Sequence, residues 1–267
     1  MKDIKIVFTD LDSTLTKEEK VIDIENKRMF ERLSSIGIPV VISTGRSIPY
    51  TIPICKQYMT SNYMICSNGA EIYNYLTKKV IYRNVIKMEN IEYLDSLVKK
   101  YNLYFTANGI NKRYSNKTFD NIGLSFIERL SDIEDDISQV VIESYDIENM
   151  KFLRKDLDDN KELKIINKTK HIAEGKLLYY DIVNCSVSKG EAVKILCKEL
   201  DIECSRAMAI GDSANDIEML ESVGYKVAVN NASDELKKIA DVVTLSNKEN
   251  GVLVVLKELY KEKIKGE

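Results

Sequence analysis

The sequence predicts an α/β protein in which a parallel-sheet core is interrupted by an inserted α+β domain. Near the start, apolar runs at residues 4–8 and 38–43 flank a helical pattern with Met29, Leu33 and Ile36 on its apolar face. Strand, helix and strand of this length form a βαβ unit, which builds parallel sheets. From about residue 79 the pattern changes to tyrosine-rich strand segments between helices. At 267 residues the chain is also more typical of two domains than of one.

The charge composition excludes several classes of partner. The chain has 39 basic and 42 acidic residues, a formal net charge of -3 and no long run of one sign. This balance is not that of a protein that binds nucleic acid or a membrane surface. The opening apolar run is too short for a signal peptide, and no window reaches membrane-spanning length. We therefore expect a cytoplasmic protein with a small-molecule partner, while the sequence leaves its oligomeric state open.

Cysteine and histidine usage narrows the chemistry. The five cysteines form no C-x-x-C pair and lie mostly within apolar segments, so we expect reduced core thiols. His171 is the only histidine, which removes nearly all histidine-based triads and metal sites. If the protein is an enzyme, carboxylates and lysine must carry its chemistry. The cysteines are Cys55, Cys66, Cys185, Cys197 and Cys204.

Two carboxylates follow the first buried strand. Asp10 and Asp12 are two residues apart, so extended backbone would place both side chains on one face. Their mutual repulsion raises the proton affinity of one of them unless a cation lies between them. The pair therefore suits a divalent metal together with an acid/base group. The simpler alternative, that such carboxylates end the strand, cap a helix or face water, is favoured for the pair taken alone.

The second strand leads into Thr44, Gly45 and Arg46. A hydroxyl, a glycine that lets the backbone approach, and a guanidinium suit a phosphoryl group at a strand end. An ordinary turn with a solvent-facing arginine is the alternative, and it is favoured for this stretch alone. A third short strand at residues 63–66 leads into Ser67, Asn68, Gly69 and Ala70, a further turn at the same edge of the sheet.

The middle of the chain is expected to fold as its own α+β domain with an antiparallel sheet. Strand patterns lie at residues 80–82, 103–106, 139–143, 163–166 and 177–182, and helical patterns near 90–101, 125–130 and 147–158. The polar stretch 108–121 is the expected mobile loop.

The core pattern resumes near residue 184. Lys189 opens a helix with an apolar face, and a buried strand at residues 206–210 ends on a stretch containing Asp212 and Asp216. A helix starting there would place these two carboxylates on one face of its first turn. The simpler alternatives are an N-cap role for Asp212 and a solvated Lys189. Two more strands at 227–229 and 241–244 and a final helix complete the core.

In combination these stretches resemble the haloacid dehalogenase superfamily of phosphotransferases and, within it, the Cof-type sugar phosphatases. The matching stretches are Phe8-Thr9-Asp10-Leu11-Asp12-Ser13-Thr14-Leu15, Ile42-Ser43-Thr44-Gly45-Arg46, Val187-Ser188-Lys189-Gly190 and Gly211-Asp212-Ser213-Ala214-Asn215-Asp216. The resemblance implies a Rossmann-like core. The insert lies between Arg46 and Lys189, which resembles the class with an α+β (C2B-like) cap. We therefore expect core residues 1–79, a cap at 80–183 and core residues 184–267.

This chain departs from the Cof-like pattern at two places. Ser13 stands where that pattern usually has Gly, and Asn230-Asn231-Ala232 stands where it has Gly-Asn-Ala. The resemblance therefore does not carry the identity of the substrate.

The resemblance implies a Mg²⁺-dependent phosphatase that hydrolyses a small phosphorylated metabolite through an aspartyl phosphate, with a sugar phosphate as the family's usual substrate. Asp10 would be the nucleophile and Asp12 the acid/base, with Thr44 and Lys189 also catalytic. Mg²⁺ would be held by Asp10, the Asp12 backbone carbonyl and Asp212, with Asp216 supporting that shell or orienting Lys189. Substrate-binding residues would be Leu11, Thr44, Gly45, Arg46, Lys189 and Asn215. For Asn215 and Arg46, local structural support is an equal alternative.

Three other functions remain open at this stage. A phosphomutase would return the phosphoryl group to a sugar phosphate rather than to water. A signalling receiver would keep a long-lived phosphoryl-aspartate, and a regulatory protein on the same scaffold would have lost catalysis.

Overall fold

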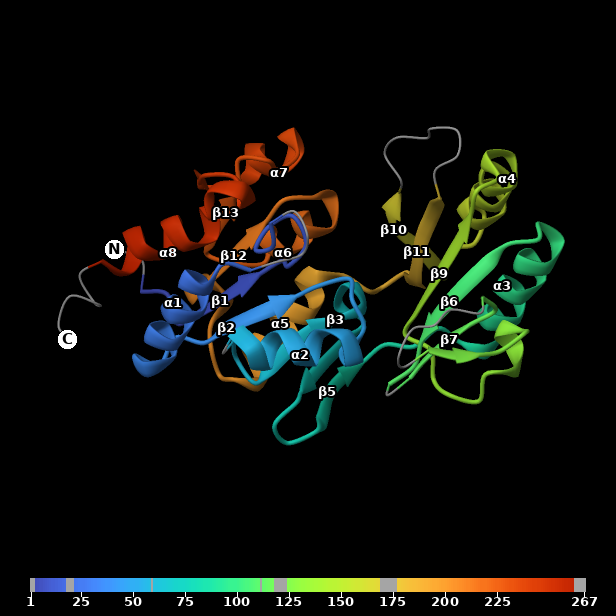
Figure 1. Cartoon of the computed structure of the whole chain (residues 1–267), viewed down its shortest axis with the longest axis horizontal. Helices are drawn as coiled ribbons and strands as arrows, with labels where there is room; N and C mark the ends of the chain where they lie inside the picture. The colour runs from blue at the N-terminus through green and yellow to red at the C-terminus, as the bar shows by residue number, and fades with distance from the viewer. Residues whose placement is uncertain are drawn as a thin grey trace. The chain divides into compact units, whose positions relative to one another are not determined.

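The computed structural model describes residues 3–17, 22–58, 60–110, 112–117, 124–168 and 177–261. The chain divides into two compact units, Met1–Tyr82 with Ser188–Glu267, called here the core domain, and Arg83–Val187, the inserted domain. Figure 1 shows the chain from its blue N-terminal part to its red C-terminal part. The breaks after Tyr82 and Val187 lie slightly later in the chain than the expected ones after residues 79 and 183.

Within the described residues, eight strands form the sheet of the core domain. Neighbouring strands are parallel from the edge strand β14 as far as β3, and β4 is antiparallel to β3. In spatial order the strands are β14 (Val242–Val243), β13 (Tyr225–Ala228), β12 (Ala207–Gly211), β1 (Ile6–Thr9), β2 (Val40–Ser43), β3 (Tyr63–Cys66), β4 (Glu71–Asn74) and β5 (Lys79–Arg83).

The central strands of this sheet are buried along their whole length, as their apolar sequences predict. Every residue of β1, β2 and β12 is buried. Strands covered on both faces read as continuous apolar runs, because no residue faces water. The helices of this domain are α1 (Ile24–Ser35), α2 (Ile48–Tyr58), α5 (Lys189–Glu199), α6 (Ile217–Glu221), α7 (Asp234–Ile239) and α8 (Gly251–Tyr260).

The expected helix after the first strand is present, but it ends earlier than its apolar pattern suggests. α1 begins at its N-cap Asp23, whose carboxylate accepts the Glu25 N–H. Met29 and Leu33 are buried, whereas Ile36 lies at the C-cap with 38% of its surface exposed. The sequence analysis did not predict α2, α7 or β4.

In the inserted domain, six strands within the described residues form a second sheet. Neighbouring strands in this sheet are antiparallel except β7 and β8, which are parallel. Helices α3 (Met88–Lys100) and α4 (Ile147–Asp158) cover one face, because their buried side chains share a core with alternate residues of the strands. The spatial order is β10 (Leu163–Lys168), β11 (Leu178–Asn184), β9 (Gln139–Ser144), β6 (Tyr104–Asn108), β7 (Arg113–Ser115) and β8 (Leu124–Phe126).

Three expectations for the middle of the chain need correction. The strand expected in the insert at residues 80–82 is β5, an edge strand of the core sheet. The helix expected at 125–130 is absent, since Leu124–Phe126 forms β8 and a 3₁₀ turn follows at Leu130–Asp132. That turn is fixed by Asp95, whose carboxylate accepts the Leu130 N–H at 2.7 Å. Within the polar stretch 108–121, Arg113–Ser115 is a strand, while residues 111 and 118–121 lie outside the described residues.

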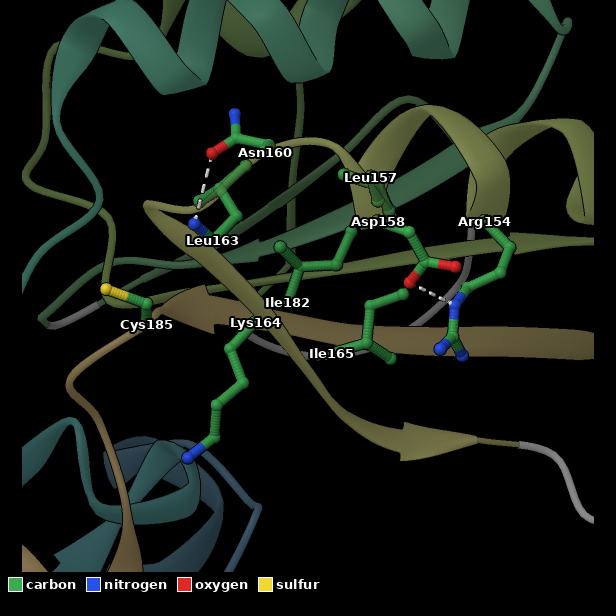
Figure 2. Close-up of a pocket in the computed structure, with 9 residues that line it drawn as sticks. All are labelled: Arg154, Leu157, Asp158, Asn160, Leu163, Lys164, Ile165, Ile182 and Cys185. Atoms are coloured by element: carbon green, nitrogen blue, oxygen red, sulfur yellow. Dashed lines mark hydrogen bonds and ion pairs between the residues drawn. The ribbon is translucent and has the colours of Figure 1, made fainter.

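The inserted domain contains a pocket of about 330 Å³ beside α4, β10 and β11 (Figure 2). Its wall combines apolar side chains such as Ile165 and Ile182 with the Arg154–Asp158 ion pair, whose charged atoms are 2.7 Å apart. None of the sequence-predicted site residues lines it. Among the described residues, no helix is both long and apolar enough to cross a membrane.

Candidate active site

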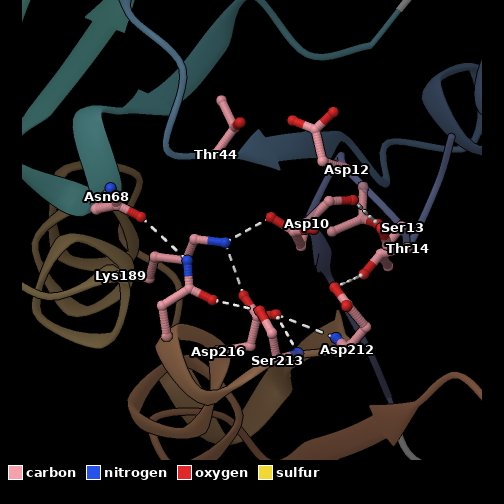
Figure 3. Close-up of polar contacts among 12 residues, drawn as sticks. Asp10, Asp12, Ser13, Thr14, Thr44, Asn68, Lys189, Asp212, Ser213 and Asp216 are labelled. Atoms are coloured by element: carbon pink, nitrogen blue, oxygen red, sulfur yellow. Dashed lines mark hydrogen bonds and ion pairs between the residues drawn. The ribbon is translucent and has the colours of Figure 1, made fainter. Parts of the chain in front are cut away.

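The carboxyl ends of three neighbouring core strands bring the predicted site residues together. β1 pairs in parallel with β12 on one side and with β2 on the other. Asp10 follows β1, Thr44 follows β2, Asp212 follows β12, and Lys189 opens α5. Ligands of open α/β sheets bind at this edge, because the loops that leave parallel strands converge there. Figure 3 shows the Lys189 side chain pointing toward Asp10 and Asp216, with Asp212 close by, while the Thr44 side chain points away from this group.

A buried lysine joins two of the carboxylates. Lys189 Nζ lies 2.5 Å from Asp10 Oδ1 and 2.7 Å from Asp216 Oδ1, and its side chain is fully buried. One carboxylate oxygen from each of Asp10, Asp212 and Asp216 lies within 4.8 Å of the others. Lys189 is therefore not the solvated charge that its place on a helix could have meant.

The start of α5 is held close to its neighbours by two glycines and a cap. Ser188 is the N-cap, and its hydroxyl accepts the Glu191 N–H at 3.0 Å. A Cβ on Gly69 would lie 2.2 Å from the Ser188 carbonyl oxygen, and one on Gly190 would lie 2.3 Å from the Glu218 carbonyl oxygen. These close approaches fix the backbone that carries Lys189.

Asp212 and Asp216 have different roles from those that a helix turn would give them. Asp216 Oδ2 accepts the backbone N–H groups of Asp212 and Ser213 at 3.0 and 3.1 Å. Ser213, and not Asp212, is the N-cap of the short 3₁₀ helix Ala214–Asp216, so the N-cap alternative for Asp212 is wrong. Asp212 lies before that helix and accepts a hydrogen bond from Thr14 Oγ1 at 2.8 Å. Asp216 thus braces the loop, and Asp212 faces the loop that follows β1.

Burial and like charge act on the protonation of this cluster. Burial raises the pKa of Asp10 well above its usual value, opposed by Lys189 and reinforced by Asp216 and Asp212. Burial, with the Asp216 charge second, raises the pKa of Asp212 to about 6. Burial lowers the pKa of Lys189, but Asp10 and Asp216 outweigh it and raise that pKa.

The donor set suits a hard divalent cation. Three carboxylates and one ammonium, when ionised, leave an excess of two negative charges in a buried site. Oxygen ligands are those that Mg²⁺ prefers, and the described residues at this site offer no histidine or cysteine cluster that would suit zinc. Asp10 and Asp212 therefore fit the metal that the resemblance implies, and Asp216 is already engaged by Lys189 and the loop.

Asp12 lies apart from this buried cluster. Both of its oxygens accept hydrogen bonds from Arg46, from Nε at 2.9 Å and from Nη2 at 2.5 Å, and its side chain is 48% exposed. β1 ends at Thr9, so the extended geometry that would place Asp10 and Asp12 on one face does not continue through them. Instead Asp10 pairs with Lys189, and Asp12 pairs with Arg46.

The remaining predicted residues lie around this edge of the sheet. Thr44 is buried, and its hydroxyl accepts the Arg46 N–H at 3.2 Å. Leu11 is buried, and its carbonyl accepts N–H groups from Leu15 and Thr16, which turns the chain after β1. Asn215 donates from Nδ2 to Asn68 Oδ1 at 3.0 Å.

The sequence reasoning missed Asn68 as a site residue. It is 1% exposed, with φ of 57°, and its side chain lies 3.1 Å from the position of a Cβ on Gly45. Its N–H donates to the Thr44 carbonyl at 3.0 Å, which ties the two turns together. The turn at residues 67–70 after a strand at the same edge was the signal that could have identified it.

Two asparagines from the C-terminal part hold the loop after Asp12. Asn231 Nδ2 donates to the Ser13 carbonyl, and Asn247 Nδ2 donates to the Thr16 carbonyl, both at 2.8 Å. Asn231 Oδ1 in turn accepts the Asn247 N–H at 2.9 Å. Since Ser13 has a φ of 65°, this network stabilises a left-handed conformation that side chains other than glycine rarely adopt.

Comparison with known proteins places this chain in a family. Residues 7–256 match the haloacid dehalogenase-like hydrolase family. A 5-amino-6-(5-phospho-D-ribitylamino)uracil phosphatase of Bacillus subtilis, YcsE, is 32% identical over 251 residues, which are 94% of this chain and 93% of that protein. A phosphoglycolate phosphatase of Archaeoglobus fulgidus is 28% identical over 258 residues, 96% of each chain.

Solved structures share the fold over nearly the whole chain. A haloacid dehalogenase-like hydrolase from Bacteroides thetaiotaomicron has a TM-score of 0.86 at 22% identity, covering 96% of this chain and 99% of that one. One from B. subtilis has a TM-score of 0.83 at 25% identity, covering 96% and 100%. With its sequence match, fold and carboxylate-lysine site taken together, the chain belongs to the haloacid dehalogenase-like hydrolase family and is an enzyme of its phosphatase type.

Proposed function

We propose that this phosphatase is Mg²⁺-dependent and hydrolyses a small phosphorylated metabolite, with sugar phosphates as the favoured class. The observation that carries the proposal is the buried Lys189 between Asp10 and Asp216, beside Asp212, at the carboxyl ends of β1 and β12. A nucleophile, a cation and carboxylate ligands in one small volume suit phosphoryl transfer.

In the first step, Asp10 attacks phosphorus. A bond forms between an Asp10 oxygen and phosphorus, the ester P–O bond breaks, and Asp12 gives a proton to the leaving oxygen. The products are an aspartyl phosphate and the alcohol. Dividing hydrolysis in this way lowers a barrier for which enzymes supply accelerations of up to about 10²¹-fold.

In the second step, water attacks the phosphorus of the aspartyl phosphate. Asp12 takes the proton from that water, the bond between Asp10 and phosphorus breaks, and inorganic phosphate leaves. Both carboxyl groups return to their starting protonation states. One residue therefore serves as acid and then as base.

Asp10, the Asp12 backbone carbonyl and Asp212 would hold Mg²⁺, which supplies positive charge to the phosphoryl oxygens. Thr44, the Gly45 N–H and Lys189 would hold those oxygens as their charge shifts, and Leu11 and Asn215 would also contact the substrate. Loss of one such donor commonly costs on the order of 10²-fold in rate.

We further propose that the inserted domain is the cap that selects the substrate. Its sheet has one face packed against α3 and α4, and Tyr179, 41% exposed, lies on the opposite face by strand alternation. Tyr179→Ala should change the ratio of kcat/KM between two substrates and keep the Mg²⁺ dependence. An unchanged ratio in this and similar substitutions on that face contradicts the selecting role.

The names of the relatives support the class of substrate and no single compound. The B. subtilis relative is named for a ribityl phosphate and the A. fulgidus relative for phosphoglycolate, so similar chains act on different alkyl phosphates. We also propose a cytoplasmic location, supported by five cysteines that are all free thiols in the described chain.

The test is release of inorganic phosphate from a panel of phosphorylated metabolites, with excess Mg²⁺ and with a chelator. We expect release from a subset of the panel, abolished by the chelator and restored by Mg²⁺. Transfer to a second sugar phosphate without phosphate release would indicate a mutase. A stable phosphoprotein without turnover would indicate a phosphoacceptor, and no reaction of either kind would refute the proposal.

A further inference from the structure

Arg46 donates hydrogen bonds to both carboxylate oxygens of Asp12. Its Nε donates to Oδ2 at 2.9 Å and its Nη2 donates to Oδ1 at 2.5 Å, which is a bidentate fork. Two parallel hydrogen bonds fix the orientation of a carboxylate as well as its position, which a single bond does not. The plane of the Asp12 carboxyl group is therefore set by Arg46.

The backbone of Arg46 is itself fixed at the sheet edge. Its N–H donates to Thr44 Oγ1 at 3.2 Å, and its carbonyl accepts the Ser67 N–H at 2.9 Å. These hydrogen bonds fix the backbone from which the side chain extends. The side chain is 23% exposed and reaches Asp12 from the end of β2. This anchoring gives the guanidinium a defined direction.

Stability is a weak reason for such a pair. Ion pairs with exposed partners contribute about 0–1 kcal/mol, because solvent screens them. Asp12 is 48% exposed, so the pair belongs to that range. Orientation of the carboxyl group is the larger effect that a fork at this place can have.

We propose that Arg46 is the positioning residue of the acid/base Asp12. Each carboxylate oxygen has two lone pairs, so accepting one N–H leaves the other lone pair for a proton. When Asp12 gives its proton to the leaving oxygen, the O–H electron pair stays on the carboxylate, beside the Arg46 guanidinium. Arg46 contacts Asp12 and no reacting atom. This inference rests on the proposed phosphatase function.

A substrate-contacting Arg46 would behave differently. A guanidinium on the phosphoryl group helps every phosphate ester alike, since the phosphoryl group is common to them all. A guanidinium that positions the acid helps most where the leaving oxygen needs a proton, and least where it departs readily as an anion. The dependence of the rate on the leaving group therefore separates the two roles.

The experiment measures kcat/KM with Mg²⁺ for 2,4-dinitrophenyl, 4-nitrophenyl and phenyl phosphate, whose leaving groups increase in basicity in that order. kcat/KM reports the steps up to departure of the phenol. The variants are Arg46→Ala, Arg46→Lys, Asp12→Asn and the double variant Arg46→Ala with Asp12→Asn. Arg28→Ala, which removes an exposed ion pair with Glu25 on α1, is the matched control.

Arg46→Ala should lose on the order of 10²-fold with phenyl phosphate and within about threefold with the dinitrophenyl ester. Arg46→Lys should show the same steep dependence, because an ammonium cannot form the fork. Added guanidinium ion should restore part of the phenyl phosphate activity of Arg46→Ala. In the Asp12→Asn background, removing Arg46 should have little further effect, and Arg28→Ala should behave as wild type.

An equal loss across the series would overturn the inference and indicate contact with the phosphoryl group. So would unchanged activity of Arg46→Ala, or an additional loss in the double variant. The unfolding midpoint of each variant in urea separates these results from misfolding, and a misfolded Arg46→Ala leaves Arg46→Lys as the test. Wild-type protein that hydrolyses none of the three esters would refute the proposed function, and the inference with it.

Discussion

Lys189 and its carboxylate partners make this edge of the sheet suited to binding a further cation. A buried ion pair is costly to desolvate, and well-packed apolar residues are often as stable or more stable in its place. The fully buried Lys189 side chain between Asp10 and Asp216 is therefore better explained by chemistry than by stability. Since one ammonium cannot balance three carboxylates, the cluster attracts a further cation.

If Asp212 holds the metal ion as proposed, metal binding should depend on pH. Burial and the Asp216 charge raise its pKa to about 6, from an ordinary 3.8, so protons compete with a cation below that pH. Mg²⁺ should raise the thermal unfolding midpoint more near neutral pH than at about pH 5. Without metal, the pH dependence of folding stability has the opposite sign. A carboxyl group whose pKa is raised on folding contributes less to stability as the pH rises from about 4 to about 6.

Differential scanning fluorimetry with and without Mg²⁺ at the two pH values checks this prediction. Asp212→Asn is the control, since it should reduce the Mg²⁺-induced shift of the unfolding midpoint at both pH values. An equal Mg²⁺ shift at both pH values in the wild type would show that protons do not compete with Mg²⁺ at Asp212.

Ser13 carries backbone strain that glycine would relieve. With φ of 65°, it costs more than glycine would in the folded state, although glycine loses more entropy on folding. Ser13→Gly should leave the free energy of unfolding unchanged or raise it by up to about 1 kcal/mol. Ser13→Val should lower it, because a β-branched residue tolerates this conformation poorly. Urea unfolding curves measure both, and a less stable Ser13→Gly would contradict the strain.

At the scale of elements, three segments meet where α5 begins: the start of α5 itself, α6 and the turn that contains Gly69. Gly190 lies against the Glu218 carbonyl of α6, and Gly69 lies against Ser188. The helix start is therefore placed by backbone contacts from two directions. Lys189 gains its position from these contacts, because it is the first residue of the helix.

Gly190→Ala should reverse the usual effect of alanine in a helix. Alanine normally stabilises a helix by about 0.5–1 kcal/mol over glycine. Here its Cβ would lie 2.3 Å from a backbone oxygen, so α5 or α6 must shift, and we expect a loss of about 1–3 kcal/mol. Urea unfolding measures the loss and phosphate release measures the effect on Lys189. A variant as stable as wild type would show that the two helices separate easily.

At the scale of the molecule, each domain has its own buried core. Leu94 in α3 belongs to the core of the inserted domain, and Leu33 in α1 is buried in the core domain. Both are fully buried. Two cores joined through the chain at Tyr82–Arg83 and Val187–Ser188 allow one domain to be weakened separately.

Leu94→Ala should destabilise the inserted domain by about 2–5 kcal/mol, through lost burial and the cavity left behind. Hydrogen exchange followed by mass spectrometry should then show faster exchange in residues 83–187 and little change elsewhere. Leu33→Ala is the matched control, with the opposite distribution. Faster exchange throughout the chain in Leu94→Ala would contradict separate cores.

The sequence predicted best where burial and periodicity coincide. The strands at residues 6–9, 40–43 and 207–211 follow from apolar runs that both sheet faces require, and α4 follows from its helical spacing. The parallel order of these strands then explains why Asp10, Thr44 and Asp212 lie at one edge.

Tertiary contacts decided what periodicity could not. β8 and the turn at Leu130 depend on sheet pairing and on Asp95, far away in sequence. The separation of Asp12 from Asp10 depends on the end of β1 at Thr9 and on the contact of Asp12 with Arg46. The position of Asn68 depends on its left-handed backbone conformation. No local pattern encodes these partners. Asp95 and Arg46 lie more than thirty residues from Leu130 and Asp12, β7 lies about ten residues before β8, and propensity does not specify the conformation of Asn68.

The most direct measurement of the central claim is the site of phosphorylation during turnover. Wild-type protein is mixed with Mg²⁺ and an aryl phosphate, quenched in acid within the first turnover, digested and mapped by mass spectrometry. The account predicts a phosphoryl group on Asp10, and neither that adduct nor phosphate release in Asp10→Asn of unchanged fold. Phosphate release at the wild-type rate from Asp10→Asn, or a phosphoryl group on another residue, would contradict it.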